Sequence, residues 1–339
     1  MADPKIRPLL ALTMGDPVGV GPEIIVKALT DARIYQLCRP LVIGDLPALE
    51  RARQMLDPAL KINLADSPEA GHYRLGTIDL AALSQLQPGD LRYGEPTPAS
   101  GKAMVSYILT AIDLALLKKV AGIVTGPISK LSMNLSGHAY PGHTELLAEK
   151  TGAPEYAMML AGGDFRVVLA TIHCALAEVP RLLNRDGLLR LFRLTVKALA
   201  QDFGLEGVPL AVAALNPHAG EGGMFGREEE EIILPAVREA QAQGLPIQGP
   251  FPADTLFWRH RQGDFAAVVC MYHDQGLIPL KLLHFMDGVN VTLGLPIIRT
   301  SVDHGTAYDL AGTGQAASLS LKAAITVAAG MAARRFSRI

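Results

Sequence analysis

An apolar strand that ends abruptly in polar residues most constrains the fold of this chain. Residues 265–271 (FAAVVCM) are small or branched, as expected of a strand buried on both faces, and a polar segment containing His273 follows at once. Gly276 is expected to let the backbone turn there. The same design recurs at His173 (VVLATIH) and His218 (AVAALNPH). Such strands, alternating with helical patterns, predict an α/β fold whose parallel strands end at a common edge.

Composition narrows the class of protein. A chain of 339 residues is long enough for two domains, and 49% hydrophobic residues with 5% aromatic residues are typical of a soluble α/β enzyme. A net charge of −2 argues against a nucleic-acid partner. Residues 1–8 have no signal-peptide core, and the apolar helical stretch 323–333 is too short to span a bilayer. Three scattered cysteines form no metal-binding pair, so we expect a cytoplasmic protein with no membrane partner.

A glycine-rich turn at residues 15–21 follows the first predicted strand, at 9–14, and leads into a helix from about residue 22 to residue 37. It looks like a dinucleotide-binding loop, but its spacing is not GxGxxG and Pro22 removes one amide that could bind a phosphate. We therefore interpret it as a tight strand-to-helix turn near a site, and leave a cofactor role open.

The three histidines are the candidate metal ligands. His173, His218 and His273 each close an apolar strand, so their imidazoles can converge. Neutral imidazole binds zinc and other divalent ions, and three protein ligands leave a position open for substrate. One such histidine alone is more often a hydrogen-bonded structural residue, but three at equivalent places favour a shared metal. Asp254 and Asp274 could orient an imidazole or ligate the metal directly.

Cationic and amide side chains mark a candidate anion site. Lys281, Asn290 and Arg299 offer the point charge, the donor and the bidentate fork that a phosphate or carboxylate needs. Surface salt bridges are the alternative role for each. Because Arg299 follows the apolar segment 294–298, burial is the better interpretation for it.

Two further segments carry candidate binding residues. His143 and Thr144 stand at a predicted helix N-terminus within residues 136–145, where they could donate to an anionic ligand. The alternative is that Thr144 only caps the helix. Lys130 follows the short strand predicted at residues 123–124, and a surface turn is equally compatible with that segment.

The chain resembles the family of NAD-dependent 4-hydroxythreonine-4-phosphate dehydrogenases of pyridoxal phosphate biosynthesis. The likeness runs nearly end to end and rests on long blocks that recur in order. They are TMGDPVGVGPE (13–23), VTGP (124–127), GHTE (142–145), LNPHAGEGG (215–223), GPFPADTLF (249–257), MYHDQGLIPLK (271–281) and GVNVTLGLPIIRTSVDHGTA (288–307).

The resemblance implies a fold and roles for the residues. The implied fold is that of isocitrate and isopropylmalate dehydrogenases, two α/β domains with an active-site cleft between them, and we expect residues 1–128 with 300–339 in the first and 129–299 in the second. NAD would bind without a Rossmann fingerprint, with NADP as an alternative. The implied metal ligands, shared between the partners of a homodimer, are His173, His218 and His273, with Zn, Mg or Co as the metal. The implied substrate contacts are His143, Thr144, Lys281, Asn290 and Arg299.

The reaction implied by the resemblance is oxidation of 4-phosphohydroxy-L-threonine at its 3-hydroxyl, followed by decarboxylation to 3-amino-2-oxopropyl phosphate. Asp254, Asp274 and Lys130 are candidates for the base. A branch of the family acts on 4-phospho-D-threonate or 4-phospho-D-erythronate, and the sequence alone leaves both substrates open. A metal-dependent phosphoester hydrolase and a non-catalytic small-molecule binding protein are the alternatives from other classes.

Overall fold

The computed structural model describes residues 7–138, 140 and 142–336. The chain forms two compact units: unit 1 comprises Met1–Pro154 and Leu295–Ile339, and unit 2 comprises Glu155–Gly294. Residues 129–154 and 295–299, which the sequence analysis placed in the second domain, therefore belong to unit 1. The reason is packing, because helices from 129–154 lie against a helix of unit 1 and the strand beginning at residue 299 pairs within its sheet.

Unit 1 is built on a parallel sheet with strand order β3-β4-β2-β1-β5-β12. Its strands are β1 (Leu9–Thr13), β2 (Arg39–Asp45), β3 (Lys61–Leu64), β4 (Thr77–Ser84), β5 (Gly122–Thr125) and β12 (Arg299–Val302). Its helices are α1 (Gly21–Leu29), α2 (Ala32–Leu37), α3 (Leu46–Leu56), α4 (Pro98–Leu116), α5 (Lys130–Leu135), α6 (His143–Thr151) and α12 (Leu319–Phe336). The helix predicted over residues 22–37 is thus two helices, since Asp31 caps a new one.

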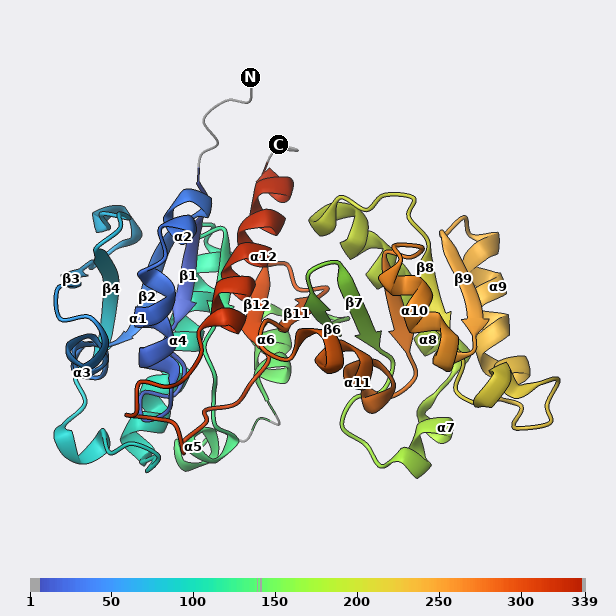
Figure 1. Cartoon of the computed structure of the whole chain (residues 1–339), viewed down its shortest axis with the longest axis horizontal. Coiled ribbons are helices and arrows are strands. Elements are labelled where there is room, and N and C mark those ends of the chain that lie inside the picture. Colours follow the sequence, from blue (N-terminus) through green and yellow to red (C-terminus); the bar gives the residue numbers. More distant parts are fainter. Residues whose placement is uncertain (1–6, 139, 141, 337–339) are drawn as a thin grey trace, which may run out of the picture. The chain divides into compact units, whose positions relative to one another are not determined.

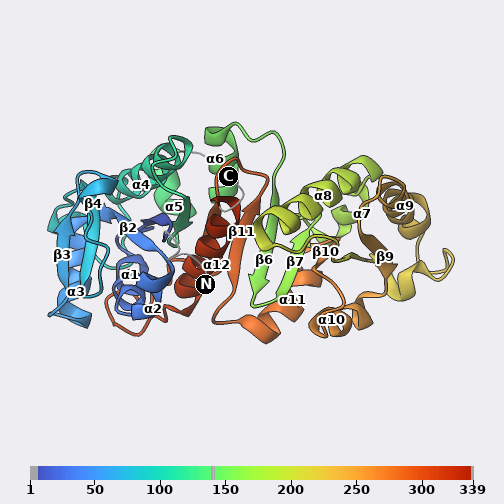
Figure 2. The same cartoon turned by 90° about the horizontal axis from the view of Figure 1, so that it is seen from above.

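Helices cover both faces of the unit 1 sheet (Figures 1 and 2). α12 packs on β12 and β5, with α1 beside it, while α4 packs on β1, β2 and β5 from the other face. α4 is long and apolar enough to cross a membrane by length and composition, with a mean hydropathy of 1.2. Its side chains at Met104, Ile108 and Ile112 are buried against the sheet, as in the core helix of a folded domain.

Unit 2 contains a mixed sheet with strand order β11-β6-β7-β10-β8-β9. β6 runs antiparallel to β11 and β7, whereas β7, β10, β8 and β9 are parallel neighbours. The strands are β6 (Ala157–Gly162), β7 (Phe165–Leu169), β8 (Leu210–Ala213), β9 (Ile247–Phe251), β10 (Ala267–Cys270) and β11 (Val289–Leu293). The helices are α7 (Val179–Leu182), α8 (Arg185–Ala198), α9 (Leu234–Ala242), α10 (Ala253–Arg261) and α11 (His273–His284). α10 and α11 cover one face of this sheet, and α8 and α9 the other (Figure 2).

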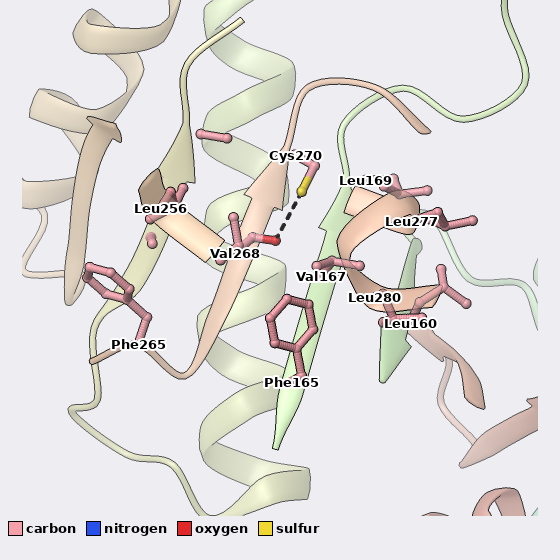
Figure 3. Packing of buried hydrophobic residues seen from close by; sticks show 12 residues of the cluster. Leu160, Phe165, Val167, Leu169, Leu256, Phe265, Val268, Cys270, Leu277 and Leu280 are labelled. Atoms are coloured by element: carbon pink, nitrogen blue, oxygen red, sulfur yellow. Dashed lines mark hydrogen bonds between the residues drawn. The ribbon is translucent and has the colours of Figure 1, made fainter. Parts of the chain in front are cut away.

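One core cluster of unit 2 lies between its sheet and the helices α10 and α11. Figure 3 shows Phe165 and Val268 from the sheet packed beside Leu277 and Leu280 from the helix. The predicted turn at Gly276 is wrong, because α11 starts at His273 and Gly276 lies in its first turn. A Cβ atom there would lie 2.9 Å from Cys270 Sγ, so the missing side chain lets α11 approach β10 closely.

Candidate functional site

The three candidate metal histidines lie just beyond three neighbouring parallel strands of unit 2. β10 pairs with β7 on one side and β8 on the other, so the carboxyl ends of these strands meet at one edge of the sheet. His173 follows β7, His218 follows β8, and His273 is the first residue of α11 after β10. The three histidines therefore follow the ends of strands, as the sequence predicts.

His173 and His273 face one another. Their ring centroids are 5.8 Å apart. Two imidazoles that share a tetrahedral metal at about 2.0–2.1 Å would have centroids roughly 5 Å apart, so the pair needs only a small adjustment to hold an ion. His273 Nδ1 is 2.7 Å from Asp274 Oδ1, which accepts, so in the neutral form of the ring Nε2 is the nitrogen with a lone pair for a ligand.

His218 stands apart from this pair in its environment. It lies in a short 3₁₀ turn, Pro217–Gly220, with a backbone φ of 53°. Its ring centroid is 6.0 Å from that of Phe225. Within the part of the chain that the structure describes, no group of three His, Cys, Asp or Glu side chains is close enough to hold a metal ion. One chain therefore presents the facing imidazole pair, and a third ligand requires either a movement of the His218 turn or a second copy.

Three other candidate residues of unit 2 lie on three different elements, α10, α11 and β11. Asp254 is exposed in the first turn of α10, and α10 packs against the Pro217–Gly220 turn. Lys281 lies eight residues after His273, which is about 12 Å along α11. Its ammonium is 5.9 Å from the centre of the Phe285 ring. Asn290 is half-buried in β11.

Unit 1 contains a buried cationic cluster around Arg299. This side chain begins β12, is 2% exposed, and donates from Nη2 to Thr125 Oγ1 at 2.9 Å. Burial lowers the pKa of Arg299 to about 9, and the Glu145 carboxylate opposes that shift. The guanidinium stays protonated at neutral pH, so a positive charge is held inside the unit.

His143 belongs to the same cluster. Burial, and then the charge of Arg299, hold the pKa of His143 well below its usual value, so its ring is neutral. Among the residues that the structure describes, none bonds to its buried Nε2 atom, which leaves that atom ready for a ligand. Thr144 is buried as the second residue of α6, whose N-cap is Gly142, so Thr144 does not cap this helix. Ala139 and Pro141, in the same predicted loop, lie outside the described residues.

The remaining candidate, Lys130, is the exposed first residue of α5. Beside it, the structure reveals a buried network that the sequence analysis missed. Asp16 accepts hydrogen bonds from the Ser132 hydroxyl, from Tyr308 OH at 2.7 Å and from Val18 N at 3.1 Å. Only the Gly15-Asp16-Pro17 turn after the first strand hinted at Asp16, since Ser132 and Tyr308 are remote from it in sequence.

The glycine-rich turn at residues 15–21 is a structural turn. Val18 N is bonded to Asp16 Oδ1 at 3.1 Å, Gly19 N to Asp16 O at 3.1 Å, and Val20 N to Thr306 O at 3.0 Å. Since Pro22 has no amide hydrogen, this turn does not present the row of free amides that cradles a dinucleotide phosphate. These residues do not fit a Rossmann-type phosphate site.

Comparison with known proteins identifies the family of this chain. The profile of a family described as "Pyridoxal phosphate biosynthetic protein PdxA" matches residues 36–328. A 4-hydroxythreonine-4-phosphate dehydrogenase of Desulforapulum autotrophicum is 54% identical over 95% of this chain and 95% of that protein. A D-threonate 4-phosphate dehydrogenase of Cupriavidus necator is 44% identical over 97% of this chain and 98% of that protein.

A solved structure extends the likeness to the backbone. The 4-hydroxythreonine-4-phosphate dehydrogenase of Klebsiella pneumoniae superposes with a TM-score of 0.89 at 41% identity, covering 97% of this chain and 99% of that chain. This confirms the two-domain α/β fold that the sequence predicts. The chain is a member of the PdxA family, and its named relatives are dehydrogenases.

Proposed function

We propose that this protein oxidises 4-phosphohydroxy-L-threonine at its 3-hydroxyl with NAD and decarboxylates the product to 3-amino-2-oxopropyl phosphate, in pyridoxal phosphate biosynthesis. The observation that carries this choice is the higher identity to a relative named for that substrate, 54%, than to one named for D-threonate 4-phosphate, 44%. The dehydrogenase names also favour this function over a phosphoester hydrolase or a non-catalytic binding protein.

We propose a divalent metal, with Zn, Mg or Co as candidates, at the strand-end histidines. The facing rings of His173 and His273 support it, as does the lone pair that Asp274 leaves on His273. When bound, such an ion lowers the pKa of a coordinated hydroxyl and stabilises negative charge on oxygen. The role of the protein is to present neutral imidazoles to the ion. Asp274 would hold His273 in the tautomer whose Nε2 is free to bind it.

The Arg299 cluster is proposed to bind the anionic end of the substrate. A buried guanidinium with Thr125 as neighbour offers a charged fork, and the neutral ring of His143 offers an unpartnered nitrogen beside it. Burial strengthens each hydrogen bond to an anion and fixes the distance of that anion from the reacting carbon. Thr144, Lys281 and Asn290 remain proposed substrate contacts.

The reaction also needs a base that removes the proton of the hydroxyl and a nucleotide that accepts the hydride. Since Asp274 already accepts from His273, its proposed role is to orient that imidazole, and Asp254 and Lys130 remain the candidates for the base. NAD, or NADP in its place, would accept the hydride, and the glycine-rich turn at 15–21 is not proposed as its phosphate site.

We also propose a cytoplasmic homodimer that shares the metal site. Support comes from α11, where Ile278, Leu282 and Phe285 form an exposed apolar stripe at helical spacing, and Leu282 and Phe285 are 84% and 74% exposed. Such a stripe is unfavourable in water and is typical of a surface covered by another subunit. One chain brings only His173 and His273 together among the three histidines, which is a second argument that two subunits share the metal site.

The test is the appearance of NADH absorbance when the protein, NAD and a divalent ion are mixed with substrate. Activity with 4-phosphohydroxy-L-threonine supports the proposal. Activity only with 4-phospho-D-threonate moves the protein to the other branch, with the same site chemistry. Absence of NADH with both compounds, in protein shown to bind metal, would overturn the dehydrogenase proposal in favour of a hydrolase.

A further inference from the structure

A chain of buried hydrogen bonds ties together the three strand ends that carry the candidate metal histidines. Thr171, beyond β7, donates from Oγ1 to the Met271 carbonyl at 2.7 Å. The Met271 amide, beyond β10, donates to Gln275 Oε1 at 2.7 Å. Gln275 Nε2 in turn donates to the carbonyl of Ala214, beyond β8, at 2.7 Å. One glutamine side chain therefore bridges the ends of β10 and β8.

The bonds continue into the segment that carries His218. Glu229 is 3% exposed and accepts from Leu215 N at 2.7 Å and from Asn216 N at 2.8 Å, both at Oε1. Its Oε2 accepts from Asn216 Nδ2 at 2.9 Å. The next residues, His218 and Ala219, have φ angles of 53° and 54°, which non-glycine residues adopt only when their surroundings hold them there. Glu229 is the buried anchor from which this strained turn starts.

The spacing between network and histidines is the same at all three strands. Each histidine lies two residues beyond a network member: His173 after Thr171, His218 after Asn216, and His273 after Met271. Two residues span at most about 7 Å, so the backbone of each histidine lies close to a segment that the network holds. Gln275 joins the ends of β10 and β8 by one bond to each, and Glu229 holds the segment before His218 by three bonds.

We propose that Gln275 and Glu229 are positioning residues that fix the His218 segment against the ends of β8 and β10 and thereby set the affinity of the protein for a divalent ion. This rests on the proposed metal site. Loss of such supporting hydrogen bonds around a metal site weakens metal binding by about 10- to 100-fold. The argument uses residues of unit 2 alone.

The experiment measures the Zn²⁺ affinity of the full-length protein by competition with a chromogenic chelator, with circular dichroism to establish folding. The variants are Gln275→Glu and Glu229→Gln. Their matched controls are Gln262→Glu and Glu230→Gln, which make the same changes at exposed positions. The first substitution adds a negative charge and the second removes one, so an effect of charge alone would move the two affinities in opposite directions. Positioning predicts that both weaken, by about 10- to 100-fold, while both controls stay within about twofold.

A double-mutant cycle separates positioning from general stability. In a His218→Ala background, Gln275→Glu should weaken Zn²⁺ binding by no more than about threefold, because the residue it positions is gone. An undiminished effect in that background, or wild-type affinity in both single variants, would overturn the inference and leave the proposed function standing. No Zn²⁺ binding by the wild-type protein would overturn the metal site and this inference together. Glu229→Gln retains shape, so it decides the question if Gln275→Glu does not fold.

Discussion

His260 should make unit 2 lose stability below neutral pH. The ring is 3% exposed, between α10 and β7. Its Nε2 is 2.9 Å from the backbone N of Arg166, which can only donate, so Nε2 accepts. Its Nδ1 is 3.1 Å from Phe265 O and therefore carries the proton. A second proton on Nε2 would point at the Arg166 amide hydrogen and would be buried.

The pKa of His260 gives the size and the sign of the effect. Burial is the main cause that lowers this pKa from 6.5 to about 4, and the Arg166 charge acts in the same direction. Between these values the unfolded chain binds a proton that the folded chain does not, so stability falls as pH falls through this window. At pH 5 the loss relative to pH 7 is about 2 kcal/mol, and it approaches about 3 kcal/mol near pH 4.

The assay compares wild type with His260→Gln, which does not titrate. Urea unfolding is followed by circular dichroism and by fluorescence of Trp258, the single tryptophan, which lies on α10 with His260. Other titrating groups are common to both proteins and cancel in the comparison. The unfolding free energy of wild type should therefore fall between pH 7 and pH 5 by about 2 kcal/mol more than that of the variant.

A control and a direct titration complete this test. His72→Gln, at an exposed position, should keep the wild-type pH dependence. Imidazole NMR signals should show that His260 remains neutral at pH 5. An equal fall in stability for wild type and His260→Gln, or a protonated ring at pH 5, would refute the reasoning.

Three further predictions follow from the site and the backbone. His218→Ala should leave the protein folded by circular dichroism and reduce NADH formation almost to zero, and near-normal turnover would remove His218 from the metal site. Arg299→Lys should lower kcat/KM by at least about tenfold, because a lysine cannot keep the bond to Thr125 and present a fork as well, and an unchanged value would place the substrate anion elsewhere. Gly21→Ala should destabilise unit 1 severely in urea unfolding, since its Cβ would lie 2.0 Å from the Met14 carbonyl oxygen; Gly89→Ala, with open space, is the control, and equal stability of the two variants would contradict this close approach.

The apolar runs in the sequence were sufficient to predict the strands that precede the histidines. β7, β8 and β10 are short apolar runs buried on both faces, so their ends were visible as sudden changes to polar residues. The same logic failed at Gly276, because glycine in a polar segment suggests a turn. Only the contact with Cys270 shows that this glycine serves the packing of a helix. No prediction was made for β6, although the two residues that join it to β7, Gly163 and Asp164, are typical of a hairpin turn.

The sequence by itself determined the α/β class, the strand-end position of the three histidines, and, through its long motif blocks, the family. The tertiary structure alone decided which polar side chains are buried with hydrogen-bond partners from other parts of the chain. Gln275, Glu229 and Asp16 sit among many similar polar residues along the chain, and what distinguishes them is burial against partners remote in sequence. A buried amide or carboxylate must satisfy its hydrogen bonds inside the protein, and which groups do so depends on how the strands are ordered in the sheet.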